Sequence, residues 1–108
     1  MSSPLESLGR FARPAQQILT ILGQGPRIPA ALRGEVRARC GDDIGPGTLF
    51  GTLARLERRG LVEVIPSPAA PRAYRITGLG ADTLEAQLAS MTSRGRRVQG
   101  FLTRSAVT

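Results

Sequence analysis

The stretch of residues 45–60 limits the fold of this chain most strongly, because helix signals stand at both of its ends. Pro46 suits the first turn of a helix, where its missing N–H group would have no partner in any case. Gly60 suits the left-handed residue that follows the last turn. We therefore predict a helix between them, with one side packed into a core by three leucines at helical spacing: Leu49, Leu53 and Leu56.

The opposite side of this predicted helix combines small glycines with hydroxyl groups and arginines, and its strip of polar residues contains no carboxylate. The N-terminus of a helix adds partial positive charge. Such a surface approaches a polyanion closely, since no bulky side chain holds it off. An ordinary solvated face is the alternative interpretation. The nucleic-acid contacts predicted on this helix are Gly47, Thr48, Gly51, Thr52, Arg55, Arg58 and Arg59.

Two short β-rich runs follow the helix, at residues 61–65 and 72–77, and a proline-rich turn separates them. This pattern predicts a β-hairpin attached to the C-terminal end of the helix. The returning run carries Arg72 and Arg75, which we predict to contact phosphates. A helix followed by a basic hairpin is the arrangement of a winged helix.

The same residues resemble the PadR family of bacterial transcriptional regulators. The resemblance covers residues 15–91 and is most specific in Gly-Pro-Gly-Thr-Leu-Phe at 45–50, Arg-Leu-Glu at 55–57, Gly-Leu-Val at 60–62 and Tyr-Arg-Ile-Thr at 74–77. Within this signature two positions depart from the family pattern: Gly45 stands where Ser is common, and Phe50 where Tyr is usual. Residues 28–32, Ile-Pro-Ala-Ala-Leu, also differ from the family's usual His-Gly-Tyr-Glu-Leu-like sequence. Without a hydroxyl, Phe50 cannot bond a phosphate, and we interpret it as a core residue.

The composition favours an anionic partner, because 15 basic residues face 8 acidic ones and give a net charge of +7. Every basic residue is an arginine, the side chain best suited to bidentate contacts with phosphate and guanine, although a genome rich in G and C would have the same effect. The chain has no histidine and a single cysteine, Cys40. We therefore predict no enzyme, no metal site and no cofactor. Cys40 is interpreted as a buried or inert thiol at a helix end rather than a redox sensor.

The N-terminal half is expected to contribute an arm and two core helices. Residues 1–12 are predicted to form an N-terminal arm that is either frayed or ordered only by a partner. Amphipathic spacing predicts one helix from Pro14 to about residue 22 and a second over residues 28–40. With the helix at 45–60 and the hairpin, these elements make residues 13–77 a winged helix-turn-helix DNA-binding domain.

Residues 78–108 are predicted to form a C-terminal dimerisation helix and tail. Apolar and small residues recur there at alternating spacings of three and four, the repeat of a coiled-coil seam. A seam of this length is too long for one small domain to bury alone. Gly95 within it either permits close helix approach or ends the helix. The predicted dimer interface consists of Leu84, Leu88, Met91, Val98 and Leu102.

The expected fold is thus mainly α with a small β-hairpin, a winged helix-turn-helix with a C-terminal dimerisation helix. The resemblance implies a sequence-specific repressor that binds double-stranded DNA as a homodimer on an inverted-repeat operator. It also allows a small-molecule effector of unknown identity. The alternative is a winged-helix protein-interaction module without direct DNA binding. No apolar run of membrane length and no signal-peptide core occur in the sequence, so a cytoplasmic, nucleoid-associated protein is expected.

Overall fold

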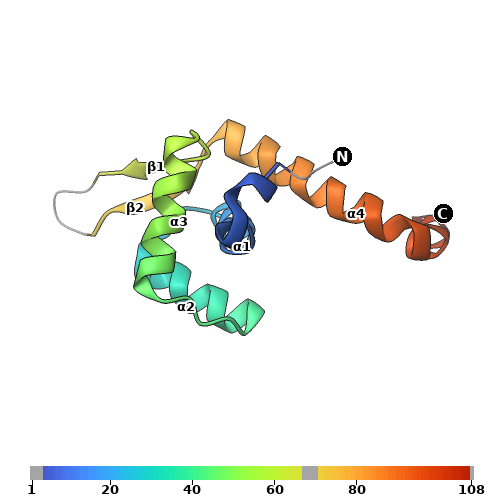
Figure 1. Ribbon diagram of the computed structural model, residues 1–108, viewed down its shortest axis with the longest axis horizontal. Coiled ribbons are helices and arrows are strands. Elements are labelled where there is room, and N and C mark those ends of the chain that lie inside the picture. The colour runs from blue at the N-terminus through green and yellow to red at the C-terminus, as the bar shows by residue number, and fades with distance from the viewer. Residues whose placement is uncertain (1–3, 67–70, 108) are drawn as a thin grey trace.

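The computed structural model describes residues 4–66 and 71–107, with their side chains as far as residue 92. Three helices pack together, a two-stranded hairpin projects from one end, and a long C-terminal helix extends from the other (Figure 1). This is the predicted mainly α fold with a hairpin wing. The elements are the 3-10 helix η1 (Glu6–Phe11), α1 (Ala12–Leu22), α2 (Pro29–Cys40), α3 (Pro46–Arg58), β1 (Val62–Ile65), β2 (Ala73–Ile76) and α4 (Gly78–Val107).

Helix α1 lies at the centre of the core and contacts α2, α3, α4 and the hairpin. Its apolar residues recur at helical spacing, and Ile18 and Leu19 are completely buried. The three leucines predicted to bury one side of α3 are all buried, which confirms that prediction. Gly60 has a φ of +74°, the left-handed conformation expected after the last turn of α3.

The N-terminal segment packs into the core instead of fraying, so the expectation of an arm is wrong for residues 4–12. Leu5 is completely buried, and Leu8 and Phe11 are each 8% exposed. These residues recur at intervals of three along a segment that is kinked at Gly9, and all three are part of the core. The backbone N–H of Leu5 also donates a hydrogen bond to Oε1 of the buried Gln87, which ties this segment to α4.

The hairpin pairs antiparallel in the register Val62↔Ile76 to Ile65↔Ala73. A third segment joins it, because Arg27 in the loop between α1 and α2 exchanges both backbone hydrogen bonds with Tyr74, at 2.8 and 3.0 Å. The sequence alone did not predict this pairing. It anchors the base of the wing to the loop that enters α2.

The junction between the hairpin and α4 is tightly closed. The Thr77 hydroxyl donates to the Gly60 carbonyl and accepts from the backbone N–H of Gly80, the second contact being a cap for α4. A Cβ atom on Gly80 would lie 2.0 Å from the Leu61 carbonyl oxygen, so only glycine fits there. The first turn of α4 is therefore fixed against the start of β1.

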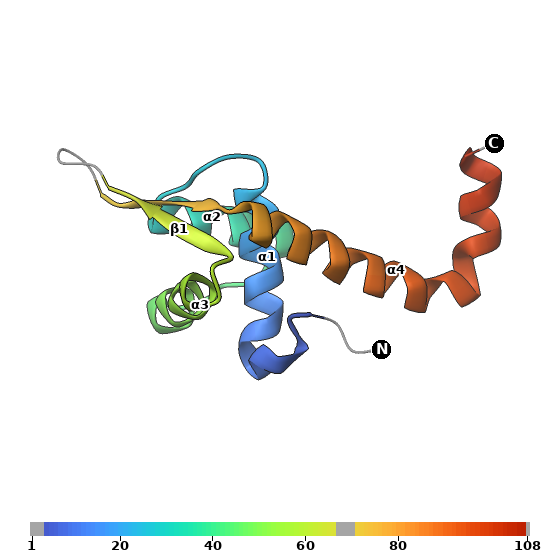
Figure 2. The ribbon, with the colours of Figure 1, turned by 90° about the horizontal axis from the view of Figure 1, so that it is seen from above.

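Helix α4 runs from Gly78 to Val107 and thus continues through Gly95. Figure 2 shows that its last part turns away from the direction of its first part. None of the described helices is both long enough and apolar enough to span a lipid bilayer.

Candidate nucleic-acid interface

The exposed side of α3 includes small residues, one aromatic ring and an arginine. Gly47, Phe50, Ala54 and Arg58 are all exposed and follow one another at spacings of three or four, which places them on one side of the helix. Gly45 precedes the helix in an extended conformation and makes no side-chain cap bond. The backbone N–H groups of the first turn therefore have no partner within the helix and donate no hydrogen bond to a capping side chain.

Thr52 is buried, so its prediction as a base contact is wrong. Its exposed fraction is 0%, and its hydroxyl donates a 2.6 Å hydrogen bond to the Thr48 carbonyl oxygen. The physical reason is its spacing, three residues after Leu49 and four before Leu56, both of which face the core. The bond satisfies a polar group inside the core, where an unpaired hydroxyl would be costly.

Phe50 is exposed, so its interpretation as a core residue is also wrong. The residue is 51% exposed. Phe50 follows the buried Leu49 by one residue, and adjacent residues of a helix point in different directions. The apolar character of the side chain favoured burial, but its position on the helix decided against it.

Arg55 lies half-buried along one edge of the exposed side. Its guanidinium carbon lies 3.8 Å from the centroid of the Phe11 ring, and its Nη1 donates a 3.0 Å hydrogen bond to the Gly51 carbonyl. A Cβ atom on Gly51 would meet the Phe11 ring at 3.2 Å. Gly51 thus allows the N-terminal segment to approach α3, and the Arg55 guanidinium lies over the Phe11 ring in a cation–π contact.

An open hollow separates the N-terminus of α3 from the N-terminal segment, and its lining includes Arg10, Phe11, Gly47 and Thr48. Both ribbon views place η1 and α3 on the same side of the molecule (Figures 1 and 2). Sequence reasoning missed Arg10 because the segment was taken for a frayed arm. The apolar residues at intervals of three, ending at Phe11, were the signal that could have found it.

The remaining predicted arginines occupy the end of α3 and the hairpin. Arg58, Arg59 and Arg72 are exposed. Arg75 is exposed as well, but it pairs across the hairpin with Glu63, its direct neighbour in the strand register. The tip of the hairpin, residues 67–70, lies outside the described residues.

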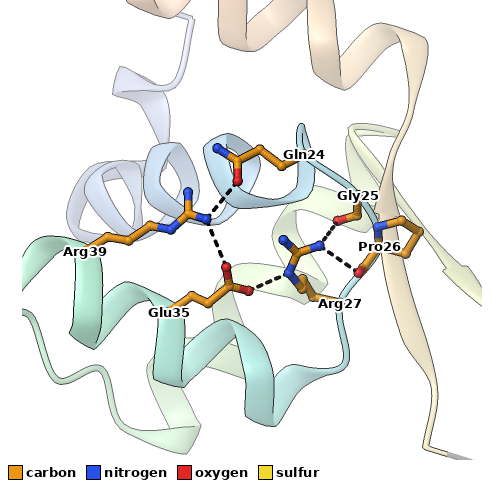
Figure 3. Close-up of polar contacts among 6 residues, drawn as sticks. All are labelled: Gln24, Gly25, Pro26, Arg27, Glu35 and Arg39. Atoms are coloured by element: carbon orange, nitrogen blue, oxygen red, sulfur yellow. Dashed lines mark hydrogen bonds and ion pairs between the residues drawn. The ribbon is translucent and has the colours of Figure 1, made fainter.

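A polar network fixes the loop before α2 (Figure 3). Glu35 accepts hydrogen bonds from Arg27 and Arg39, while Arg39 also donates to Gln24 at 2.7 Å. The hydrogen bond from Arg27 is the main cause that lowers the pKa of Glu35 below its ordinary value, and the positive charges of Arg27 and Arg39 act in the same direction. Because Arg27 also pairs with β2, the network connects α2 to the wing.

The predicted dimer residues fall into separate groups. Leu84 is half-buried against the chain's own core, next to the buried Gln87. Leu88 and Met91 are 42% and 44% exposed. The side chains of Val98 and Leu102 lie outside the described residues.

Comparisons with known proteins identify the fold. No protein-family model matches the chain. Over 81 residues, or 75% of its length, the chain is 33% identical to an uncharacterized 37.1 kDa protein in transposon TN4556 of Streptomyces fradiae. It spans only 24% of the length of that curated relative.

The solved structures that are similar to this chain include transcription regulators. A PadR-like transcription factor from Bacteroides fragilis has a TM-score of 0.73 and 23% identity over 89% of this chain and 96% of its own. RosR from H. salinarum has a TM-score of 0.66 and 27% identity over 86% of this chain and 91% of its own. A PadR family regulator from Clostridium difficile has a TM-score of 0.62 and 20% identity, covering 87% and 97%. The winged-helix fold expected from the sequence is confirmed.

Proposed function

We propose that this chain, a PadR-like winged helix, is a transcription regulator that binds double-stranded DNA in a sequence-specific manner. The observation that supports this most directly is the exposed side of α3, where Gly47 and Ala54 leave the backbone accessible and Arg58 supplies charge. A helix of this shape fits the major groove of B-DNA. The net charge of +7 favours the encounter with a polyanion.

Within this proposal, the contacts divide into base readers and phosphate contacts. The N-terminal half of α3 enters the groove, and Arg55 reads a base with its guanidinium oriented by Phe11. Thr52 contributes indirectly from within the core, because its hydroxyl bonds the backbone carbonyl of Thr48. The residues proposed to lie close to bases are Gly47, Thr48, Gly51 and Arg55, and those proposed to hold phosphates are Arg10, Arg58, Arg59, Arg72 and Arg75.

We further propose that the protein is a homodimer and a repressor. Residues 13–77 would form the DNA-binding unit, with η1 packed against it, and residues 78–108 the dimerisation unit. Leu88 and Met91 expose apolar surface on α4 that a second copy would cover. Two copies related by a twofold axis present two α3 helices, so the operator would be an inverted repeat with half-sites about one helical turn apart. The same proposal includes control by a small-molecule effector of unknown identity and association with the nucleoid through DNA binding.

The test is a selection of bound duplexes from a random pool, followed by titration of the enriched duplex at several salt concentrations. We expect an inverted repeat to be enriched and the logarithm of affinity to fall steeply with the logarithm of salt. If no sequence is enriched and binding is insensitive to salt, DNA recognition is wrong and the protein-interaction module is favoured.

Substitutions of the two hairpin arginines test whether the hairpin contacts DNA. Arg72→Ala should weaken binding to all duplexes alike and make the salt slope shallower by about 0.9, the value for one phosphate contact. Arg75→Ala should have a smaller effect, since Arg75 already pairs with Glu63. The matched control is Arg37→Ala, which removes the same charge from an exposed position on α2 outside the proposed surface. Equal slopes in all three variants would show that the hairpin does not touch DNA.

A further inference from the structure

Phe50 is the one exposed aromatic side chain among the residues whose side chains the structure describes. The chain's other described aromatic residues are the buried Phe11 and the half-buried Tyr74. Single exposed apolar residues are common on protein surfaces. The position of Phe50 is what distinguishes it, because it lies on the helix that we propose to enter the major groove.

The surroundings of Phe50 leave its ring free to project. It is the fifth residue of α3, in the N-terminal part of the helix from which recognition helices contact base edges. On the exposed side its helical neighbours are Pro46, Gly47 and Ala54, none of which has a long side chain. The ring therefore stands above the adjacent surface of α3.

The chemistry of the ring limits what it can recognise. Phenylalanine has no hydrogen-bonding group, so it cannot bond a phosphate or the polar edge of a base. The C5-methyl group of thymine is the apolar group that base edges present in the major groove, and Phe is one of the side chains that contact it. Burial of the methyl group against the ring would remove apolar surface of both from water.

We propose that Phe50 selects thymine at one position of each half-site through contact with its C5-methyl group. This inference rests on the proposed DNA-binding function and adds the kind of base that the exposed ring recognises. A wedge between base steps is a different use of an apolar side chain and is associated with the minor groove. A helix with an exposed glycine and alanine beside the ring is suited to the major groove instead.

The experiment replaces thymine by uracil, which differs only in lacking the methyl group. The duplex enriched by the wild-type chain is synthesised with each thymine changed in turn to deoxyuridine, and affinities are measured for wild type and Phe50→Ala. For wild type we expect one position per half-site at which the change weakens binding about fourfold, the factor that corresponds to about 0.8 kcal/mol for one buried methyl group. Phe50→Ala should bind the thymine and uracil duplexes equally.

Two further variants keep the result interpretable. Phe50→Leu retains an apolar side chain and should keep part of the discrimination. Leu79→Ala removes another exposed apolar side chain, at the start of α4, and should discriminate as wild type does. Because Phe50 is exposed, thermal unfolding of Phe50→Ala should match that of wild type, which would show that its altered binding is not caused by misfolding.

The outcomes separate the inference from the function on which it rests. If an operator is enriched but no uracil substitution changes wild-type binding, the thymine contact is wrong while DNA recognition stands. The same conclusion follows if Phe50→Ala retains the full preference for thymine over uracil. If no sequence is enriched at all, the proposed function fails and the inference fails with it.

Discussion

Helices α3 and α4 both have an apolar side, but the chain buries these sides to different degrees. The leucines of α3 are at most 3% exposed, whereas Leu88 and Met91 of α4 are more than 40% exposed. Helix α3 is packed by elements on several sides, including α1, α2 and β1. Helix α4 leaves the core after its first turns (Figure 1). An apolar pattern alone therefore does not show whether the apolar side of a helix is covered by the same chain or by a partner.

The strongest test of this difference is at the point where α4 is still part of the core. Gly80→Ala places a methyl group 2.0 Å from the Leu61 carbonyl oxygen, and backbone atoms cannot move aside cheaply. We expect it to lower the free energy of unfolding by about 4 kcal/mol or more. Urea unfolding at fixed protein concentration measures this, with Gly78→Ala as the control because no atom lies within 4 Å of the added Cβ. Similar stabilities for the two variants would contradict the close contact.

The next largest effect is expected where α4 is exposed. Leu88→Glu puts a carboxylate on the surface that a second copy would cover, and its burial there without a partner would be costly. The dimer should dissociate, and operator affinity should fall about 100-fold or more because the two half-sites are no longer bound together. Sedimentation and operator titration check both results.

The control for this variant is Ala86→Glu, which adds the same charge at an exposed position two residues away, on a different side of α4. It should remain dimeric. A Leu88→Glu variant that also stayed dimeric and bound normally would mean that this side of α4 does not mediate association.

On α3, the largest effect on recognition is expected at Arg55. Arg55→Ala should reduce specific affinity by about 1–3 kcal/mol and relax the preference at one base position. Selection with the variant measures the preference. Equal weakening of all sequences would place Arg55 with the phosphate contacts. Phe11→Leu keeps the core apolar but removes the ring under the guanidinium, so a smaller loss at the same base position is expected if Phe11 orients Arg55.

The smallest effect concerns acid stability. The pKa of Glu35 is lowered in the folded chain, so its carboxylate contributes stability that is fully present above the unfolded value of 4.5. This contribution is lost as the pH falls below 4.5 and through the folded pKa. Glu35→Gln should therefore lose less stability than wild type between neutral and acidic pH, as measured by thermal unfolding across that range. Parallel pH profiles would show that the network around Glu35 does not stabilise the fold.

Local patterns determined the elements of this chain and the side of α3 that faces the core. Pro46, Gly60 and the leucine spacing act within a few residues of one another, so the sequence alone was enough to place the ends of α3 and its buried side. The sequence alone was likewise enough to place the hairpin and the basic residues around it.

Only the tertiary structure decided which surfaces remain free and which segments meet. Leu5 is buried in the core and its backbone N–H bonds Gln87, 82 residues away, and Arg27 pairs with Tyr74 because the fold brings a loop beside β2. Thr52 was expected on the surface because helical spacing also aligns it with Thr48 and Arg55, and Phe50 was taken for a core residue because its ring is apolar. The packing of neighbouring elements against α3 buried Thr52 and left Phe50 exposed, because burial depends on where those elements lie and not on polarity alone.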